Sequence, residues 1–151
     1  MHKEKTQVAI IGAGPAGLML GHLLRQAGIE AIIIERRNEA HVLSRIRAGV
    51  LETVTTGILE QLDLADRMQA EGLPHSGFML ADGERLIRID IEGLTGKTVM
   101  VYGQTEVTRD LIDAAPNRDL EMIWEAEDVA LHDIASDAPS VTYTKAGIQG
   151  R

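Results

Sequence analysis

The sequence predicts an α/β fold: a βαβ unit with parallel strands comes first, and additional α+β elements follow. Two apolar, β-branched runs, Gln7–Ile11 and Ala31–Ile34, have the composition of buried parallel strands. A helix-patterned segment between them, Ala16–Ala27, supplies the right-handed crossover that parallel strands require. Farther along the chain, two helical patterns come first, and short strand patterns with one more helix among them follow. That order is typical of a parallel unit joined to mixed structure.

The composition fits one globular domain over residues 1–151 and excludes several classes of protein. With 44% hydrophobic and 25% charged residues, the chain is not disordered, collagenous or coiled-coil. Its net charge of -8 argues against nucleic acid as a partner, because phosphate binding needs surplus basic side chains. The absence of cysteine excludes a disulfide framework, a zinc ribbon, an iron–sulfur site and a thiol nucleophile. The histidines are scattered without metal-ligand spacing, so no metal site is expected.

The hydropathy pattern gives no sign of a membrane protein. No apolar run approaches the roughly 18 to 20 residues that a membrane-spanning helix needs. The apolar N-terminal run is broken by glycines before it reaches the length of a signal peptide. We therefore expect no membrane partner and a cytoplasmic location.

Each element of the first half of the chain follows from a local signal. The run Gln7–Ile11 ends at a glycine, and both of its faces are expected to be buried. The helix over Ala16–Ala27 has apolar residues at three- and four-residue spacing, and Gly28 stops it. Helical patterns also predict two helices over Val50–Gln61 and Asp63–Glu71.

The second half of the chain contains a hairpin signal, one helix and several short strands. Phe78–Leu80 and Leu86–Ile91 flank Asp82 and Gly83, a turn dipeptide that favours a β-hairpin. A helix is predicted over Glu106–Ala115, before a proline that cannot continue it. Short strands are predicted at Thr98–Tyr102, Leu120–Trp124, Val129–His132 and Val141–Thr144.

A glycine-rich turn carries the clearest functional signal. Gly12, Gly14 and Gly17 form a G-x-G-x-x-G run between a predicted strand and a predicted helix, and Glu35 ends the next strand. The first glycine permits the tight turn, the second lets the backbone approach a pyrophosphate, and the third lets helix and strand pack closely. Amides at the helix start then bind the pyrophosphate, and Glu35 accepts the ribose hydroxyls. Because a carboxylate repels a 2′-phosphate, this Rossmann-like unit is expected to hold FAD or NAD rather than NADP. An ordinary glycine-rich turn in an α/β core is the alternative.

Two arginines that lie two positions apart follow the βαβ unit. In an extended segment Arg45 and Arg47 point the same way, so both guanidinium groups can address one anion. The expected target is a pyrophosphate. A solvated charged loop is the alternative.

Four segments carry a resemblance to a known family: Gln7–Leu18, Ile34–Arg36, Arg45–Glu52 and Val101–Leu111. Many flavoproteins share the glycine pattern of the first segment, whereas the third and fourth segments are far more specific. In unbroken order from about Thr6 to His132, the sequence resembles the p-hydroxybenzoate hydroxylase family of class A FAD-dependent aromatic hydroxylases.

This resemblance implies an FAD-dependent monooxygenase that hydroxylates 4-hydroxybenzoate, or a related hydroxylated aromatic acid, to the 3,4-dihydroxy product. In the family, NADPH (NADH in some members) reduces the FAD, and O2 then forms a flavin C4a-hydroperoxide that hydroxylates the ring. The glycine loop and Glu35 would bind the adenosine side, Arg47 the pyrophosphate and Gln104 the ribityl-flavin part. The expected cofactor-binding residues are Gly12, Gly14, Ala16, Gly17, Glu35, Arg36, Arg45, Ile46, Arg47, Ala48, Gly49, Val50 and Gln104.

The sequence departs from the family pattern in three ways. Ala16 stands where serine is common, so only the backbone N–H remains there as a donor. His41 stands where tyrosine is typical of NADPH-linked members, and with Arg36 and Arg37 beside it the choice between NADPH and NADH stays open. Family members are more than twice as long.

The shorter length leads to expectations about this chain by itself. It is expected to be the N-terminal portion of a larger flavoprotein, an incomplete domain with no catalytic residue of its own, and inactive alone. The full-length form is considered a candidate homodimer. Two alternatives stay open: a different FAD oxidoreductase, and a non-catalytic dinucleotide-binding module.

Overall fold

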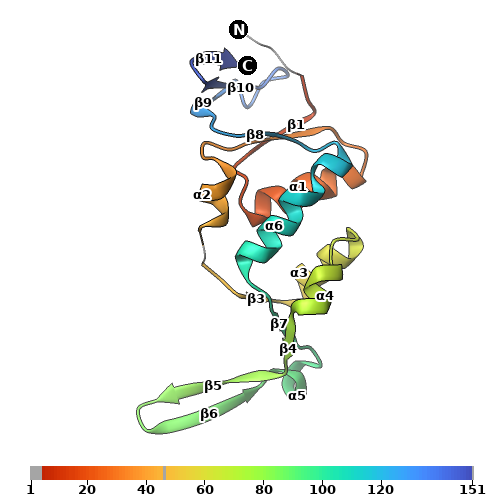
Figure 1. The fold of residues 1–151 in the computed structure, drawn as a ribbon, viewed down its shortest axis with the longest axis vertical. Coiled ribbons are helices and arrows are strands. Elements are labelled where there is room, and N and C mark those ends of the chain that lie inside the picture. The colour runs from red at the N-terminus through yellow and green to blue at the C-terminus, as the bar shows by residue number, and fades with distance from the viewer. Residues whose placement is uncertain (1–4, 46, 151) are drawn as a thin grey trace. The chain divides into compact units, whose positions relative to one another are not determined.

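The computed structural model describes residues 5–45 and 47–150, which form two compact units. The first unit contains the residues up to Arg45 and those from Leu111 onward, and the second contains residues 47–110. The second unit is thus an insertion in the sequence of the first. Figure 1 shows the elements of both units. In the described part of the chain, no helix is both long enough and apolar enough to cross a membrane.

A three-stranded parallel sheet forms the centre of the first unit. Its strands are β1 (Val8–Ile11), β2 (Ala31–Ile34) and β8 (Glu121–Ile123), in the order β1-β2-β8. Helix α1 (Pro15–Gln26) connects β1 to β2, and Gly28 follows it with a φ of 74°. This βαβ arrangement confirms the α/β fold class that the sequence predicts.

Helices cover one face of this sheet. Gly21 of α1 lies so close to the sheet that an added Cβ would be 3.0 Å from Ile33 and 2.9 Å from Leu120. The neighbouring His22 is fully buried, and its Nε2 donates a hydrogen bond to the carbonyl oxygen of Leu111 at 2.8 Å. Its Nδ1 has no hydrogen-bond partner among the described residues. Burial lowers the pKa of His22, so the ring is neutral near pH 7.

An antiparallel sheet covers part of the other face (Figure 1). Its strands are β9 (Glu127–His132), β10 (Ser140–Lys145) and β11 (Ile148–Gly150), in the order β11-β10-β9. Ile34 and Ile123 of the parallel sheet pack into a buried cluster on this side. The strands β8, β9 and β10 lie where the sequence predicts strands, whereas β11 has no counterpart in the prediction.

The prediction that β1 is buried on both faces is wrong. Ile10 is buried, whereas Ile11 is 50% exposed and Ala9 is also exposed. The reason is that β1 is an edge strand, and the buried cluster on that side contains residues of β2 and β8. A pocket of about 700 Å³ lies beside Val8 and Ala9.

The second unit contains a smaller antiparallel sheet. Its strands are β3 (Val50–Leu51), β7 (Val99–Val101) and β4 (Leu73–His75), in the order β3-β7-β4. Helices α3 (Thr53–Gln61) and α4 (Asp66–Glu71) lie between β3 and β4 in the sequence.

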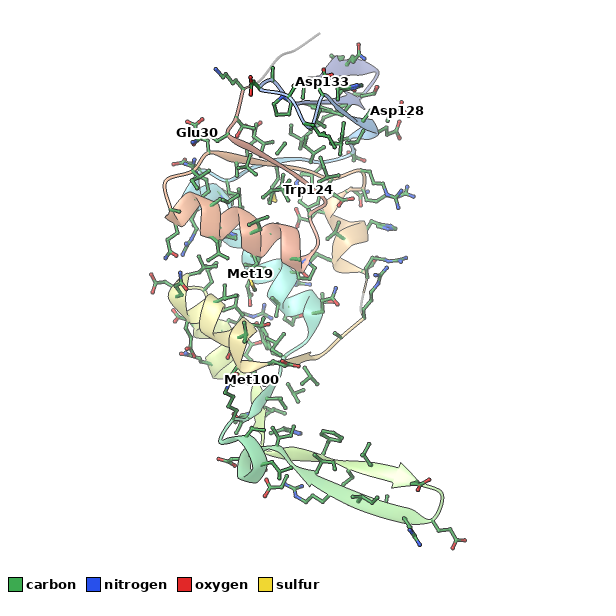
Figure 2. The ribbon with its side chains drawn as sticks, turned by 180° about the vertical axis from the view of Figure 1, so that it is seen from behind. Met19, Glu30, Met100, Trp124, Asp128 and Asp133 are labelled. Atoms are coloured by element: carbon green, nitrogen blue, oxygen red, sulfur yellow. The ribbon has the colours of Figure 1, made fainter. Side chains whose placement is uncertain are left out.

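The two helices begin later than the sequence predicts. Val50 and Leu51 are strand residues, because they pair with Val101 and Met100 of β7. The second helix begins after Asp63, which adopts a φ of 53° that an α-helix does not allow. Figure 2 labels Met100, whose sulfur would be 2.6 Å from a Cβ added at the glycine that follows α4.

The predicted hairpin is present in the second unit. Strands β5 (Gly77–Asp82) and β6 (Arg85–Asp90) pair around a turn at Gly83, where φ is 58°. The hairpin extends from β4 and β7, with helix α5 (Ile91–Thr95) at its base (Figure 1). Three apolar side chains share one of its faces, and each is about half exposed: Phe78, Leu80 and Ile87.

Two further helices lie close in sequence to the predicted site residues. Helix α2 (Glu39–Leu43) begins at Asn38, whose side chain accepts a hydrogen bond from the amide of His41 at 2.9 Å. The sequence pattern does not predict this helix. Helix α6 (Gln104–Ala114) lies where a helix is predicted, and the 3-10 turn Pro116–Arg118 follows it.

Candidate functional site

The glycine-rich turn after β1 has the backbone geometry that its sequence predicts. Gly12 adopts a φ of 108°, which favours glycine, and its amide donates to the carbonyl oxygen of Ile34 at 2.8 Å. A Cβ added at Gly17 would lie 2.1 Å from the Gly12 carbonyl oxygen. Only glycine therefore permits this turn and this approach of helix to strand.

The middle glycine leaves a backbone surface open to a ligand. A Cβ added at Gly14 would meet no atom of the described residues within 4 Å. The first hydrogen bond of α1 runs from the Leu18 amide to the Gly14 carbonyl oxygen at 3.0 Å. The amides of Ala16 and Gly17 precede that bond, and such first-turn amides have no partner within a helix. No acidic residue lies in this first turn. The open, positively polarised helix start therefore fits a pyrophosphate.

Glu35 connects the glycine loop to the end of β2. Its Oε2 accepts a hydrogen bond from the Ala13 amide at 2.9 Å, and its Oε1 accepts one from the Arg37 amide at 2.8 Å. The Glu35 backbone joins the same structure, because its amide donates to Ile123 at 2.8 Å and its carbonyl accepts from Ala126 at 2.9 Å. Each carboxylate oxygen has a second lone pair, so Glu35 can still accept ribose hydroxyls. The structure thus gives Glu35 a loop-anchoring role that the sequence does not reveal.

A pocket of about 530 Å³ lies beside this carboxylate, within the first unit. Its polar wall contains Glu35, Arg36 and Arg37, and Glu127 and Asp128 of β9 add further charge. Figure 2 labels Asp128. The pocket is lined by Ile11, Gly12, Ile34, Glu35, Arg36, Arg37, Ala126, Glu127, Asp128 and Val129. The glycine turn, the acceptor and the pocket therefore meet at the carboxyl ends of β1 and β2, where open α/β sheets bind ligands.

The polar residues after β2 are exposed. Arg36, Arg37 and His41 all have exposed side chains, and His41 lies on α2. Ala16, which replaces the family's serine, is exposed at the start of α1.

The two arginines of the predicted anion site belong to different units. Arg45 is an exposed residue at the end of the first part of the chain, where its amide donates to the carbonyl oxygen of Val42 at 3.2 Å. Arg47 is exposed in the second unit, and Ile46 lies outside the described residues. That the two guanidinium groups address one anion stays a prediction.

In the second unit, Ala48 and Gly49 pair with the residues that lead from β7 into α6. The Ala48 carbonyl oxygen accepts from the Gln104 amide at 3.0 Å, and the Gly49 carbonyl oxygen accepts from the Tyr102 amide at 2.9 Å. The structure therefore brings together two sets of predicted flavin-side residues, Ala48–Val50 and Gln104. The sequence pattern predicts helix at Val50 and does not reveal this pairing.

Together, the fold and the glycine loop define an α/β dinucleotide-binding protein. Residues 5–150 match the family model described as "FAD binding domain", so the chain belongs to the FAD-binding domain family.

The sequence is similar to hydroxylases. It is 49% identical over 148 residues to p-hydroxybenzoate hydroxylase of Acinetobacter baylyi, covering 97% of this chain and 36% of that protein. It is 30% identical over 90 residues to a probable NADH-specific resorcinol 4-hydroxylase of Rhodococcus jostii, covering 60% of this chain and 17% of that protein. The chain thus spans about a third or less of the length of these relatives.

Solved structures of monooxygenases share the fold. Anhydrotetracycline hydroxylase OxyS of Streptomyces rimosus superposes with a TM-score of 0.80 at 25% identity, covering 97% of this chain and 30% of that one. The p-nitrophenol 4-monooxygenase PnpA of Pseudomonas putida gives a TM-score of 0.79 at 19% identity, covering 99% of this chain and 38% of that one. The second likeness concerns the fold alone.

Proposed function

We propose that this chain supplies the FAD-binding part of a flavin-dependent monooxygenase that hydroxylates 4-hydroxybenzoate to 3,4-dihydroxybenzoate with NAD(P)H and O2. The observation that carries the proposal is the glycine turn anchored by Glu35, with an open backbone edge at Gly14. The similarity to p-hydroxybenzoate hydroxylase over 97% of the chain supports the choice of reaction. Bound FAD would supply the activation of O2 and the transfer of one oxygen atom to the ring.

The adenosine side of FAD is assigned to the first unit. The amides at the start of α1, including those of Ala16 and Gly17, would hold the pyrophosphate. Glu35 would accept from the ribose hydroxyls with the lone pairs that the Ala13 and Arg37 amides leave free. Arg36 lines the pocket beside Glu35 and would balance the negative charge of the pyrophosphate.

The flavin side is assigned to the second unit from the family resemblance. Arg47 would contact the pyrophosphate, Ala48–Val50 would lie along the flavin, and Gln104 would reach the ribityl part. The backbone pairing of Ala48 and Gly49 with the start of α6 supports this grouping, because it fixes both segments in one local structure.

The reductant is proposed to be NADPH or NADH, and the exposed residues Arg36, Arg37 and His41 are proposed to choose between them. A 2′-phosphate would be held by guanidinium groups, whereas a free ribose needs no cation. The cytoplasmic location and the homodimer stay predictions.

A direct test uses the protein expressed from the whole open reading frame that contains this sequence. We expect yellow protein with flavin absorbance, and oxidation of NADPH or NADH that 4-hydroxybenzoate accelerates. Chromatography should then detect 3,4-dihydroxybenzoate in an amount that matches the substrate consumed. Flavin binding without hydroxylation of this substrate would favour another FAD oxidoreductase. Nucleotide binding without flavin would favour a non-catalytic module.

A further inference from the structure

The second unit contains a cluster of charged and aromatic side chains next to the flavin-side segment, which is Ala48–Val50. Arg67 of α4 donates from Nη1 to Asp110 Oδ1 at 2.7 Å and from Nη2 to the Glu106 carboxylate, both on α6. The Tyr102 hydroxyl donates to the other oxygen of Asp110, Oδ2, at 2.7 Å. The Arg67 guanidinium also lies 5.9 Å from the centre of the Tyr102 ring, within cation–π range. Its Nε contacts Glu71 of its own helix at 3.2 Å.

The charges in this cluster depend on one another. Glu106 and Asp110 are one helical turn apart, where two carboxylates without a cation would repel. The hydrogen bond from Arg67 lowers the pKa of Glu106, so the carboxylate stays ionised. Burial, followed by the hydrogen bond to Asp110, raises the pKa of Tyr102, so its hydroxyl stays a donor. Arg67 therefore holds the start of α6 and the Tyr102 side chain in a single arrangement.

Tyr102 connects this cluster to the flavin-side segment. Its side chain is 5% exposed and belongs to the cluster, while its amide donates to the Gly49 carbonyl oxygen at 2.9 Å. Two residues later, the Gln104 amide donates to Ala48 at 3.0 Å. A displacement of the Tyr102 ring or of the first turn of α6 would therefore move Ala48, Gly49 and Gln104.

We infer that Arg67 and Asp110 are positioning residues for the flavin half of the cofactor, and that they act through Tyr102 on Ala48, Gly49 and Gln104. This inference rests on the proposed function, because that proposal assigns these three residues to the flavin. The contacts that carry this effect are those of Arg67 and Asp110 with each other and of Asp110 with Tyr102, followed by the backbone hydrogen bonds of Tyr102 and Gln104.

The test compares FAD with ADP, which contains the adenosine and the pyrophosphate of the cofactor but not its flavin. Three variants perturb the cluster in the whole-reading-frame protein: Tyr102→Phe, Asp110→Asn and Arg67→Lys. Glu71→Gln is the matched control, since it removes only the contact within α4. Dissociation constants for FAD and ADP, the visible circular dichroism of saturating FAD, and the thermal midpoint of the apoprotein are measured.

We expect the three variants to raise the FAD dissociation constant roughly 2- to 30-fold, the range for mutations that alter coupling between sites. The ADP dissociation constant should stay at the wild-type value, and the circular dichroism of bound flavin should change. Arg67→Lys keeps the charge, so it should retain more FAD affinity than a fourth variant, the neutral Arg67→Met, measured beside it. The control Glu71→Gln should match the wild type in both dissociation constants, in the circular dichroism and in the thermal midpoint.

Three results would overturn the inference. Unchanged FAD affinity and unchanged flavin circular dichroism in all three variants would remove the cluster from cofactor positioning. Equal losses of FAD and ADP affinity that follow the thermal midpoint would show a structural role only. A wild-type protein that binds ADP but not FAD would overturn the proposed function, and this inference with it.

Discussion

Replacing Glu35 should damage the protein in two separable ways, because its carboxylate serves both the fold and the proposed cofactor site. In Glu35→Ala, the amides of Ala13 and Arg37 lose their acceptors at 2.9 and 2.8 Å. The Ala13 residue is fully buried, so its amide cannot recover a water molecule easily. Leaving a buried donor unsatisfied costs about 1 to 3 kcal/mol, and we expect the apoprotein to lose stability in that range.

The effect on ligand affinity comes from the lost ribose acceptor. Hydrogen bonds to an ionised carboxylate contribute about 1.5 to 3 kcal/mol, which corresponds to a roughly 10- to 150-fold rise in dissociation constant. Because both ligands contain the adenosine, Glu35→Ala should weaken the binding of ADP and of FAD by similar factors. Glu35→Gln should fall between the two proteins, since its amide retains one accepting oxygen.

The assay is a calorimetric titration of each protein with FAD and with ADP. Thermal unfolding of each apoprotein is measured beside it. Glu30→Ala is the matched control: it removes an exposed glutamate just before the opposite end of β2, outside the pocket (Figure 2). Equal dissociation constants for wild type and Glu35→Ala would remove Glu35 from the binding site. Equal thermal midpoints would refute its loop-anchoring role.

Further predictions concern the glycine loop, the flavin-side arginine and the buried histidine. Gly17→Ala should lower the thermal midpoint, because its Cβ would lie 2.1 Å from a carbonyl oxygen, and overpacking costs about 1 to 3 kcal/mol. Gly14→Ala should leave the midpoint unchanged and weaken FAD, since its Cβ meets no described atom but would enter the ligand's space; equal effects of the two variants in melting and titration would contradict this. Arg47→Lys should reduce FAD retention on gel filtration, because a bidentate contact becomes a point contact; full retention would favour a solvated loop. The lowered pKa of His22 means that the unfolded state binds its proton first, so stability should fall as pH drops below about 6.5 by at most ~1.4 kcal/mol per pH unit. Unfolding curves of His22→Gln should show a weaker pH dependence than those of the exposed-site control His41→Gln, and parallel curves would refute this.

The sequence was most informative where neighbouring residues alone determine the structure. The strands β1 and β2, the helix between them and the glycine turn follow from local patterns, and all are present. The hairpin around Gly83 follows from its turn residues for the same reason. Local patterns thus define the adenosine side of the candidate site and the α/β class.

Structure that depends on distant partners was not predictable in this way. Val50 has an apolar helical pattern after it, and only its pairing with Val101 makes it a strand residue. The exposure of Ile11 depends on which strands the covering sheet reaches. Arg67 lies about 40 positions from Glu106 and Asp110, so no spacing rule could join them.

The order of strands in the parallel sheet has a consequence for how the chain folds. The partner of β2 on one side, β8, comes about 90 positions later, because the inserted unit, described over residues 47–110, lies between them in the sequence. The entropy lost on closing a loop grows as about (3/2)RT ln n, so a roughly fourfold shorter flexible loop between β2 and β8 recovers about 1.2 kcal/mol. An inserted unit that folds first would shorten the loop between β2 and β8 in this way, since its residues no longer belong to a flexible loop. During synthesis, one edge of β2 stays unpaired until β8 has been made. The speed at which the inserted unit folds then sets how long that edge can pair with other chains.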